Sequence, residues 1–204
     1  GVFFGLTVSI SFVAWVVATL LFLTSFTKPI HSLGILVYPL SAIAVIIAFL
    51  FPGTQGKLIS MSIAAHAFLS IGAYALLAIA VGQSLLLSIQ ERFLHEHNFN
   101  TFVDKLPALQ TMEAFLYQTL KMGFLLLTLS LISGYLYIDD FFTQKLSYKT
   151  ILSIIAWIGF AGILFGHKIF GWRGKLVAIS TQIAFAILVL SYFGTKFFLE
   201  VLSI

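Results

Sequence analysis

Long apolar runs separated by short polar connectors are the feature that most limits what this chain can fold into. A helix of about 20 apolar residues spans the roughly 30 Å hydrocarbon core of a bilayer. Of the 204 residues, 60% are hydrophobic and 9% are charged, whereas about 25% are charged in soluble domains. The longest polar stretch, residues 91–113, is too short to bury a core of its own. The sequence therefore predicts an all-α polytopic transmembrane helix bundle.

Six apolar runs are long enough to be membrane spans. They cover residues 2–26, 34–51, 58–94, 115–138, 150–170 and 176–202. The third run would measure on the order of 50 Å at helical rise, so we expect its end to project into the cytoplasm. No repeat or linker divides the chain, so residues 1–204 are expected to form a single transmembrane domain. An apolar run begins at Val2 with no basic segment before it, and we expect N-terminal helices of a longer protein to be missing.

Small residues and a proline make two local predictions around the fourth span. Gly123, Ser130, Ser133 and Gly134 lie along that span, where small side chains let helices approach closely in a membrane. Pro107 follows a polar stretch, and proline is favoured in the first turn of a helix. We expect Pro107 to begin a short interfacial helix before the fourth span.

The basic connector FGHKIFGWRGK, residues 165–175, indicates the topology. Lys and Arg near the ends of spans mark the cytoplasmic side of a membrane. One side of the predicted topology carries Lys28, Arg92, Lys105, Lys121, Lys168, Arg173 and Lys175, and the other carries Lys57, Lys145, Lys149 and Lys196. The connectors after the first, third and fifth spans are therefore expected to be cytoplasmic. The net charge of +4 lies in connectors, so it indicates orientation and no nucleic-acid partner.

The chain has no cysteine, which excludes disulfides, thiolate metal sites and covalent haem attachment through Cys. It also has no phosphate-binding glycine loop, no HExxH motif and no nucleophile elbow. Asp139 and Asp140 are adjacent in a connector, where carboxylates are usually solvated. Because no group for bond-making chemistry is visible, we expect no enzyme activity.

Two histidines within the apolar runs are the candidate ligands, because ionisable residues inside a membrane are functional candidates by default. His66 lies roughly 10 Å into the third span and His167 roughly 25 Å into the fifth, both measured from the outer side at helical rise. Two imidazoles on one iron each lie about 2 Å from it and must be nearly level. The two histidines are therefore expected to belong to two separate sites.

A structural role is the alternative for each of these histidines. His66 would then make a polar contact between helices, with its ring bonded to a serine or a carbonyl. His167 would be an interfacial histidine beside Lys168 that reaches cytoplasmic water. His95 and His97 are two positions apart and so on different helix faces, and they are interpreted as solvated.

Three stretches resemble the cytochrome c assembly proteins of the CcsA, CcmC and HemX kind. They are the segment MSIAAHAFLSIGAYALLAIAVGQSLLLSIQERFL at 61–94, the segment MEAFLYQTLKMGFLLLTLSLISGYLY at 112–137, and the region from Trp157 through GHKIFGWRGK to YFGTKF. The resemblance implies a bacterial inner-membrane protein in which histidines hold haem b. By this resemblance His167 matches the transmembrane haem histidine and His66 an outward-side one, and Arg173 and Lys175 could contact the haem propionates.

The chain departs from that family at the loop that is rich in tryptophan in its members. Here this loop reads YIDDFFTQKLSYKT and contains no tryptophan. The second outward histidine of the family is not found near FFLEVLSI. The family implies that a partner for His167 lies in a helix before residue 1. Our reading is a membrane protein that binds or translocates haem b, with lipid, haem and cytochrome c assembly or other membrane proteins as partners. The alternative is a non-haem scaffold or transporter accessory subunit that has only the family's fold.

Overall fold

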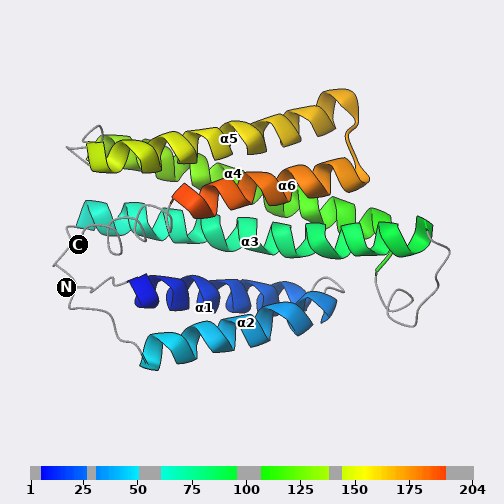
Figure 1. Ribbon diagram of the computed structural model, residues 1–204, viewed down its shortest axis with the longest axis horizontal. Helices are drawn as coiled ribbons and strands as arrows, with labels where there is room; N and C mark the ends of the chain where they lie inside the picture. The colour runs from blue at the N-terminus through cyan, green and yellow to red at the C-terminus, as the bar shows by residue number, and fades with distance from the viewer. Residues whose placement is uncertain (1–5, 27–30, 51–60, 96–106, 138–143, 192–204) are drawn as a thin grey trace.

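The computed structural model describes residues 6–26, 31–50, 61–95, 107–137 and 144–191. These residues form six α-helices, and no strand occurs among them (Figure 1). The helices are α1 (Leu6–Ser25), α2 (His31–Leu50), α3 (Met61–His95), α4 (Leu109–Tyr137), α5 (Gln144–Phe170) and α6 (Gly174–Val189). The prediction of an all-α bundle is therefore confirmed for the described part of the chain.

Helix α3 is the central element of the bundle. It packs against α4 and α6 on one side and against α1 and α2 on the other (Figure 1). Helices α1 and α2 pack on each other, and α5 packs on both α4 and α6. The most extensive packing among the described helices joins α3 to α4, and His66 of α3 lies in this interface.

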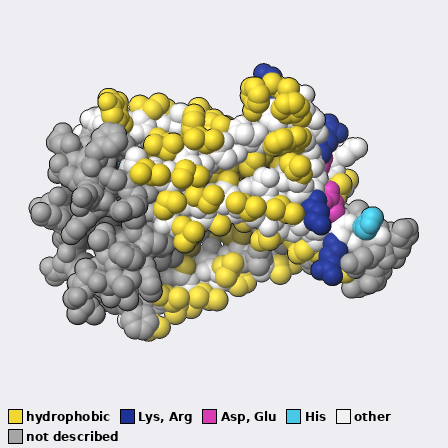
Figure 2. Space-filling model, turned by 45° about the horizontal axis from the view of Figure 1, so that its top comes forward, with side chains coloured by type: hydrophobic (Ala, Val, Ile, Leu, Met, Phe, Trp, Pro, Cys, Tyr) yellow, Lys and Arg dark blue, Asp and Glu magenta, His cyan; other side chains and the backbone are white. Residues whose placement is uncertain are grey.

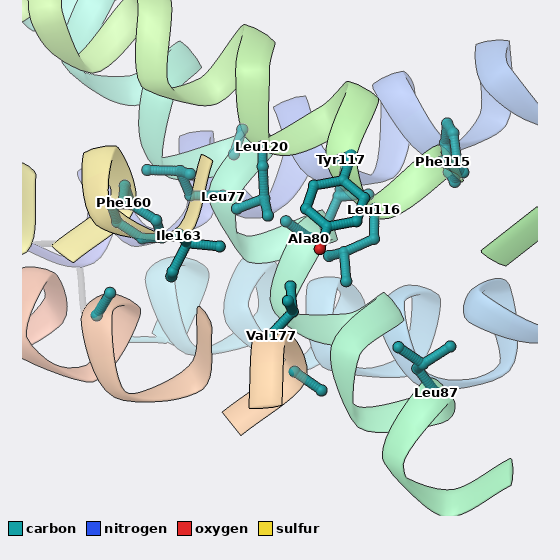
Figure 3. Packing of buried hydrophobic residues seen from close by; sticks show 14 of the residues in the cluster. Leu77, Ala80, Leu87, Phe115, Leu116, Tyr117, Leu120, Phe160, Ile163 and Val177 are labelled. Carbon is teal, nitrogen blue, oxygen red and sulfur yellow. The ribbon is translucent and has the colours of Figure 1, made fainter. Parts of the chain in front are cut away.

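The core is apolar and close-packed where α3, α4, α5 and α6 meet (Figure 3). Fully buried alanines on α3 let the neighbouring helices approach, and larger side chains fill the space between them. The larger buried residues include Leu77, Leu116, Leu120, Phe160 and Val177. Many hydrophobic side chains are exposed on the outside of the bundle, and in Figure 2 the charged side chains of the described residues gather at one end. This pattern fits a bundle whose sides face lipid.

Helices α3 and α4 approach closely at a glycine. A Cβ placed on Gly123 would lie 2.8 Å from Cδ2 of Leu77, which is fully buried. Farther along α4, Ser133 reaches the ring of His66 on α3. The expectation of close contact at the small residues of α4 is confirmed at both positions.

Three of the described helices are long and apolar enough to cross a membrane: Met61–Phe93, Leu109–Leu136 and Lys149–Phe170. The other apolar helical segments in the described residues are shorter, namely Ser11–Phe22, Val37–Leu50 and Gly174–Val189. Six spans thus stay a prediction. Helix α3 has 35 residues, which corresponds to about 52 Å at helical rise and exceeds the thickness of the hydrocarbon core.

The starts of α4 and α5 differ most from the sequence-based expectation. Helix α4 begins at Leu109 and continues without a break to Tyr137, so the separate interfacial helix expected after Pro107 is wrong. Helix α5 begins at Gln144, before the expected start near residue 150. Hydropathy marks the section of a helix inside hydrocarbon, whereas polar residues continue the same helix into water. Asp139 and Asp140 lie outside the described residues.

Candidate functional site

His66 lies between α3 and α4, half-buried in a cluster of serines. Its Nδ1 is 3.0 Å from the carbonyl oxygen of Ser130 and 3.0 Å from the hydroxyl oxygen of Ser133. The hydroxyl of Ser70, one turn along α3, is 3.5 Å from Nε2, which is the limit of a hydrogen bond. The same hydroxyl lies 2.7 Å from that of Ser130 and 2.8 Å from the carbonyl oxygen of His66.

The partners of Nδ1 decide the tautomer of His66. A backbone carbonyl oxygen can only accept a hydrogen bond, so Nδ1 carries the proton and donates it to Ser130. In the neutral imidazole, Nε2 then keeps its lone pair. Histidines that bind metals usually donate their other ring N–H to a carbonyl or carboxylate in this manner. The arrangement therefore leaves Nε2 available as a ligand atom.

His167 shows the same arrangement at the other end of the bundle. Its Nδ1 is 3.0 Å from the carbonyl oxygen of Trp172, five residues along the chain. Nδ1 must again be the donor, because the carbonyl can only accept. No described residue is hydrogen-bonded to Nε2. The imidazole plane is stacked on the phenol ring of Tyr117 from α4, with ring centroids 3.5 Å apart and an angle of 20° between the planes.

Two glycines shape the short turn that brings the Trp172 carbonyl to His167. Gly171 follows the last residue of α5 with a φ of 65°, the left-handed conformation that commonly ends a helix. The N–H of Trp172 then bonds back to the carbonyl of Gly166 at 3.3 Å. A Cβ on Gly166 would collide with the Trp172 indole. Glycine is therefore needed at 166 for close approach and is favoured at 171 for backbone geometry.

Two carboxylates hold the start of α6. The N–H of Gly174 donates to Oε1 of Glu113 at 2.7 Å, and the N–H of Lys175 donates to Glu91. A helix N-terminus has unpaired N–H groups and a partial positive charge, so both contacts are favourable. Glu91 comes from α3 and Glu113 from α4. The turn that carries Trp172 is thus fixed to both central helices.

Arg173 and Lys175, the two residues expected near haem propionates, are both exposed at this end of the bundle. The charge of Lys175 acts on Glu91 and that of Arg173 acts on Tyr117. Both cations therefore belong to the same end as His167, as their positions in the connector require.

The two histidines are far apart along the bundle. His66 contacts α4 at Ser130 and His167 contacts it at Tyr117. These α4 residues are 13 positions apart, which is about 20 Å along a helix axis. A single iron cannot bridge that distance, so the structure does not bring the two together.

Neither histidine lies in a cluster of metal-ligating side chains among the described residues. No group of three or more His, Cys, Asp or Glu side chains that could hold a metal ion occurs in the ranges that the structure describes. Haem iron differs, because the porphyrin already supplies four nitrogen ligands and the protein adds only axial ones. A single histidine with an available Nε2 can therefore serve a haem iron, although one histidine alone cannot hold a free ion.

Sequence reasoning missed Tyr117, which stacks on His167, and Glu113, which holds the adjoining turn. Glu113 and Tyr117 are four positions apart and thus on one face of α4, and this pair of polar groups beside an apolar run was the available signal. For His66, a contact of the ring with a serine or a carbonyl was one of the two interpretations of the sequence. The particular partners were not predicted.

Comparison with known proteins adds three findings. The family model for the cytochrome C assembly protein matches residues 4–203. The inner membrane protein YpjD of Escherichia coli K12 is 33% identical over 138 residues, which are 68% of this chain and 52% of that protein. No solved structure matches the chain.

Two further relatives extend the pattern. An uncharacterized 28.8 kDa protein of Azospirillum brasilense is 30% identical over 153 residues, or 74% of this chain and 56% of the relative. The cytochrome c biogenesis protein CcsA of Prochlorococcus marinus is 35% identical over 83 residues, or 40% of this chain and 26% of that protein. The chain spans about half the length of the first two of these relatives.

Proposed function

This chain belongs to the cytochrome c assembly protein family, and we propose that it binds or translocates haem b within the bacterial inner membrane. The relatives named for cytochrome c biogenesis and for the inner membrane support this proposal. In it, His167 would hold the haem iron through Nε2 of its neutral imidazole. His66 belongs to a second, weaker site at the opposite end of the bundle.

The observation that carries the proposal is the matching state of the two histidines. In each, Nδ1 donates to a backbone carbonyl, that of Ser130 for His66 and that of Trp172 for His167. Each ring is thereby held in the tautomer whose Nε2 lone pair can bind iron. A backbone carbonyl cannot be lost by side-chain substitution, so this state is independent of the residue type at either carbonyl.

The chain's own residues would bind and orient the cofactor. Bound haem would supply a redox-active iron that takes the Nε2 lone pair. Arg173 and Lys175 are at the same end as His167 and could pair with the propionates. Of the two, Arg173 is the stronger candidate, because Lys175 interacts with Glu91.

The orientation of the bundle is part of the proposal. The basic connector between α5 and α6 would face the cytoplasm, which puts the His167 end on the cytoplasmic side and the His66 end on the outer side. Haem sites near both sides of the membrane suit a protein that receives haem at one face and passes it to the other. The chain itself would make or break no covalent bond.

An absorbance spectrum of the full-length protein in mild detergent tests the proposal. We expect a Soret band that falls strongly in His167→Ala and less in His66→Ala. His95→Ala serves as the matched control, because His95 is exposed at the end of α3 and has no assigned role, and it should keep the band. A folded protein that stays colourless after haem is supplied would refute the proposal.

The second candidate function is a membrane scaffold without haem. One observation favours it: the ring of His66 is already bonded by Ser130 and Ser133 of α4, which would suffice for a contact that joins two helices. In that case His66→Ala would lower stability and the protein would carry no haem. The same absorbance experiment separates the two functions.

A further inference from the structure

We propose that Tyr117 is the positioning residue for His167, fixing the plane and tautomer of the imidazole and so tuning its bond to iron. The iron part of this inference rests on the proposed haem function. Tyr117 is 5% exposed on α4, and it was not among the residues that the sequence pointed to. Three contacts support its role.

The first contact is the ring stack. The centroids of Tyr117 and His167 are 3.5 Å apart with the planes at 20°, closer than the roughly 4.5–7 Å of ordinary aromatic pairs. Because Tyr117 is buried, it cannot move aside when the imidazole turns. Rotation of the His167 ring about its Cβ–Cγ bond would drive its edge into the phenol. The stack therefore restricts the direction in which Nε2 points.

The second contact is a shared acceptor. The Tyr117 hydroxyl donates a short hydrogen bond to the carbonyl oxygen of Trp172, and Nδ1–H of His167 donates to the same oxygen at 3.0 Å. A carbonyl oxygen has two lone pairs and can accept both. Two donors on one oxygen share its electron density, so each bond is weaker than it would be alone. The Tyr117 hydroxyl thus limits how strongly the carbonyl pulls on the imidazole proton.

The third contact fixes the acceptor itself. Glu113, one turn before Tyr117 on α4, accepts from the N–H of Gly174. One face of α4 therefore holds the hairpin on both sides of Arg173, through Glu113 and through Tyr117. The Trp172 carbonyl is held at a set position relative to α4, and the His167 ring is set by that carbonyl and by the phenol.

This arrangement predicts different effects for the hydroxyl and for the ring. In Tyr117→Phe the stack remains and the carbonyl serves His167 alone, so its bond to Nδ1–H strengthens. The imidazole becomes more electron-donating, and the haem reduction potential should shift to a more negative value. In Tyr117→Leu the stack is lost too. Haem affinity should then fall about tenfold, as is typical when a partner of a metal ligand is removed.

Tyr74→Phe is the matched control. The hydroxyl of Tyr74 on α3 donates to the carbonyl of Leu188 on α6 at 2.9 Å, which is likewise a bond from a phenol to a backbone carbonyl of another segment. Its removal should lower stability by a similar amount and leave the haem potential unchanged. A potential that moves equally in Tyr117→Phe and Tyr74→Phe, or in neither, would overturn the inference.

A readout without haem tests the same positioning. In ¹⁵N spectra of haem-free protein, the His167 signal is the one that disappears in His167→Ala. We expect a single Nδ1–H tautomer in the wild type and in Tyr117→Phe, and a mixture of tautomers in Tyr117→Leu. An unchanged single tautomer in Tyr117→Leu would overturn the positioning role. If the protein takes up no haem, the proposed function fails, while these spectra still decide the role of Tyr117.

Discussion

Nδ1 of His66 on α3 and the hydroxyl oxygen of Ser133 on α4 are 3.0 Å apart, although 67 residues separate them in sequence. The same nitrogen is 3.0 Å from the carbonyl oxygen of Ser130. The ring of His66 thus ties the two central helices together at the end of the bundle opposite His167. It also holds the tautomer that leaves Nε2 available.

Ser133→Ala should be mild, because the Ser130 carbonyl still holds Nδ1–H. We expect a loss of about 0.6 kcal/mol in the free energy of unfolding, the typical worth of a hydrogen bond between membrane helices. Unfolding by SDS titration measures it. Ser153→Ala, which removes a 2.8 Å bond between the hydroxyls of Ser153 and Ser191, is the control. Haem content is measured in the same two variants. If Ser133→Ala loses several-fold more haem than Ser153→Ala, then the hydroxyl, and not the carbonyl, holds His66.

Gly123→Ala should destabilise the contact between α3 and α4. The new Cβ would lie 2.8 Å from Cδ2 and 2.9 Å from Cγ of the fully buried Leu77, and overpacking typically costs about 1–3 kcal/mol. Gly162→Ala is the control, because nothing lies within 4 Å of a Cβ at that position of α5. It should be neutral or stabilise the helix by up to about 1 kcal/mol. Equal unfolding midpoints for the two variants would argue against this packing.

Gly166→Ala should disturb the His167 site by displacing Trp172. The new methyl group would collide with the Trp172 indole, so the indole and its carbonyl must shift, and Nδ1–H of His167 loses its acceptor geometry. We expect a destabilisation of about 1–3 kcal/mol together with a loss of Soret absorbance. Thermal unfolding and the absorbance spectrum are recorded beside Gly162→Ala. Retention of both wild-type values would mean that the turn adapts without moving the carbonyl.

Glu113 should act at the start of α6 mainly through its acceptor oxygen, because the attraction of its charge to the helix N-terminus is offset by repulsion with Glu91. Glu113→Gln keeps an acceptor for the N–H of Gly174 and removes the repulsion with Glu91, so its stability should stay close to that of the wild type. Glu113→Leu leaves that N–H without its acceptor and should cost about 1 kcal/mol, as does loss of a helix cap. Thermal unfolding measures the stability of both variants against the wild type. Equal losses would show that the charge matters and the oxygen does not.

The helical class and the small-residue contacts follow from the sequence because hydropathy and residue size are local properties. Gly123 and Ser133 could be assigned to a close helix contact without knowing the partner. The start of α4 could not be located in the same way. Hydropathy detects the lipid-facing section near residue 115, while the helix itself continues outward to Leu109.

The partners of His167 could not be predicted because they depend on the register between helices. Tyr117 meets His167 only because α4 and α5 pack side by side at the level where the α5–α6 turn folds back. No spacing within the sequence encodes that register. The separation of the two histidines could be predicted from the sequence, because it depends only on helical rise and on the alternating direction of the helices.

The measurement that tests the account most directly is the amount of haem bound per protein, determined as the pyridine haemochromogen. Wild type, His66→Ala, His167→Ala and the double variant are compared after saturation with haem in detergent. Two separate sites about 20 Å apart predict that each single variant keeps the haem of the other site and that the double variant keeps none. Loss of all haem in either single variant, in protein that stays folded, would contradict the account, because two independent sites would not be lost together.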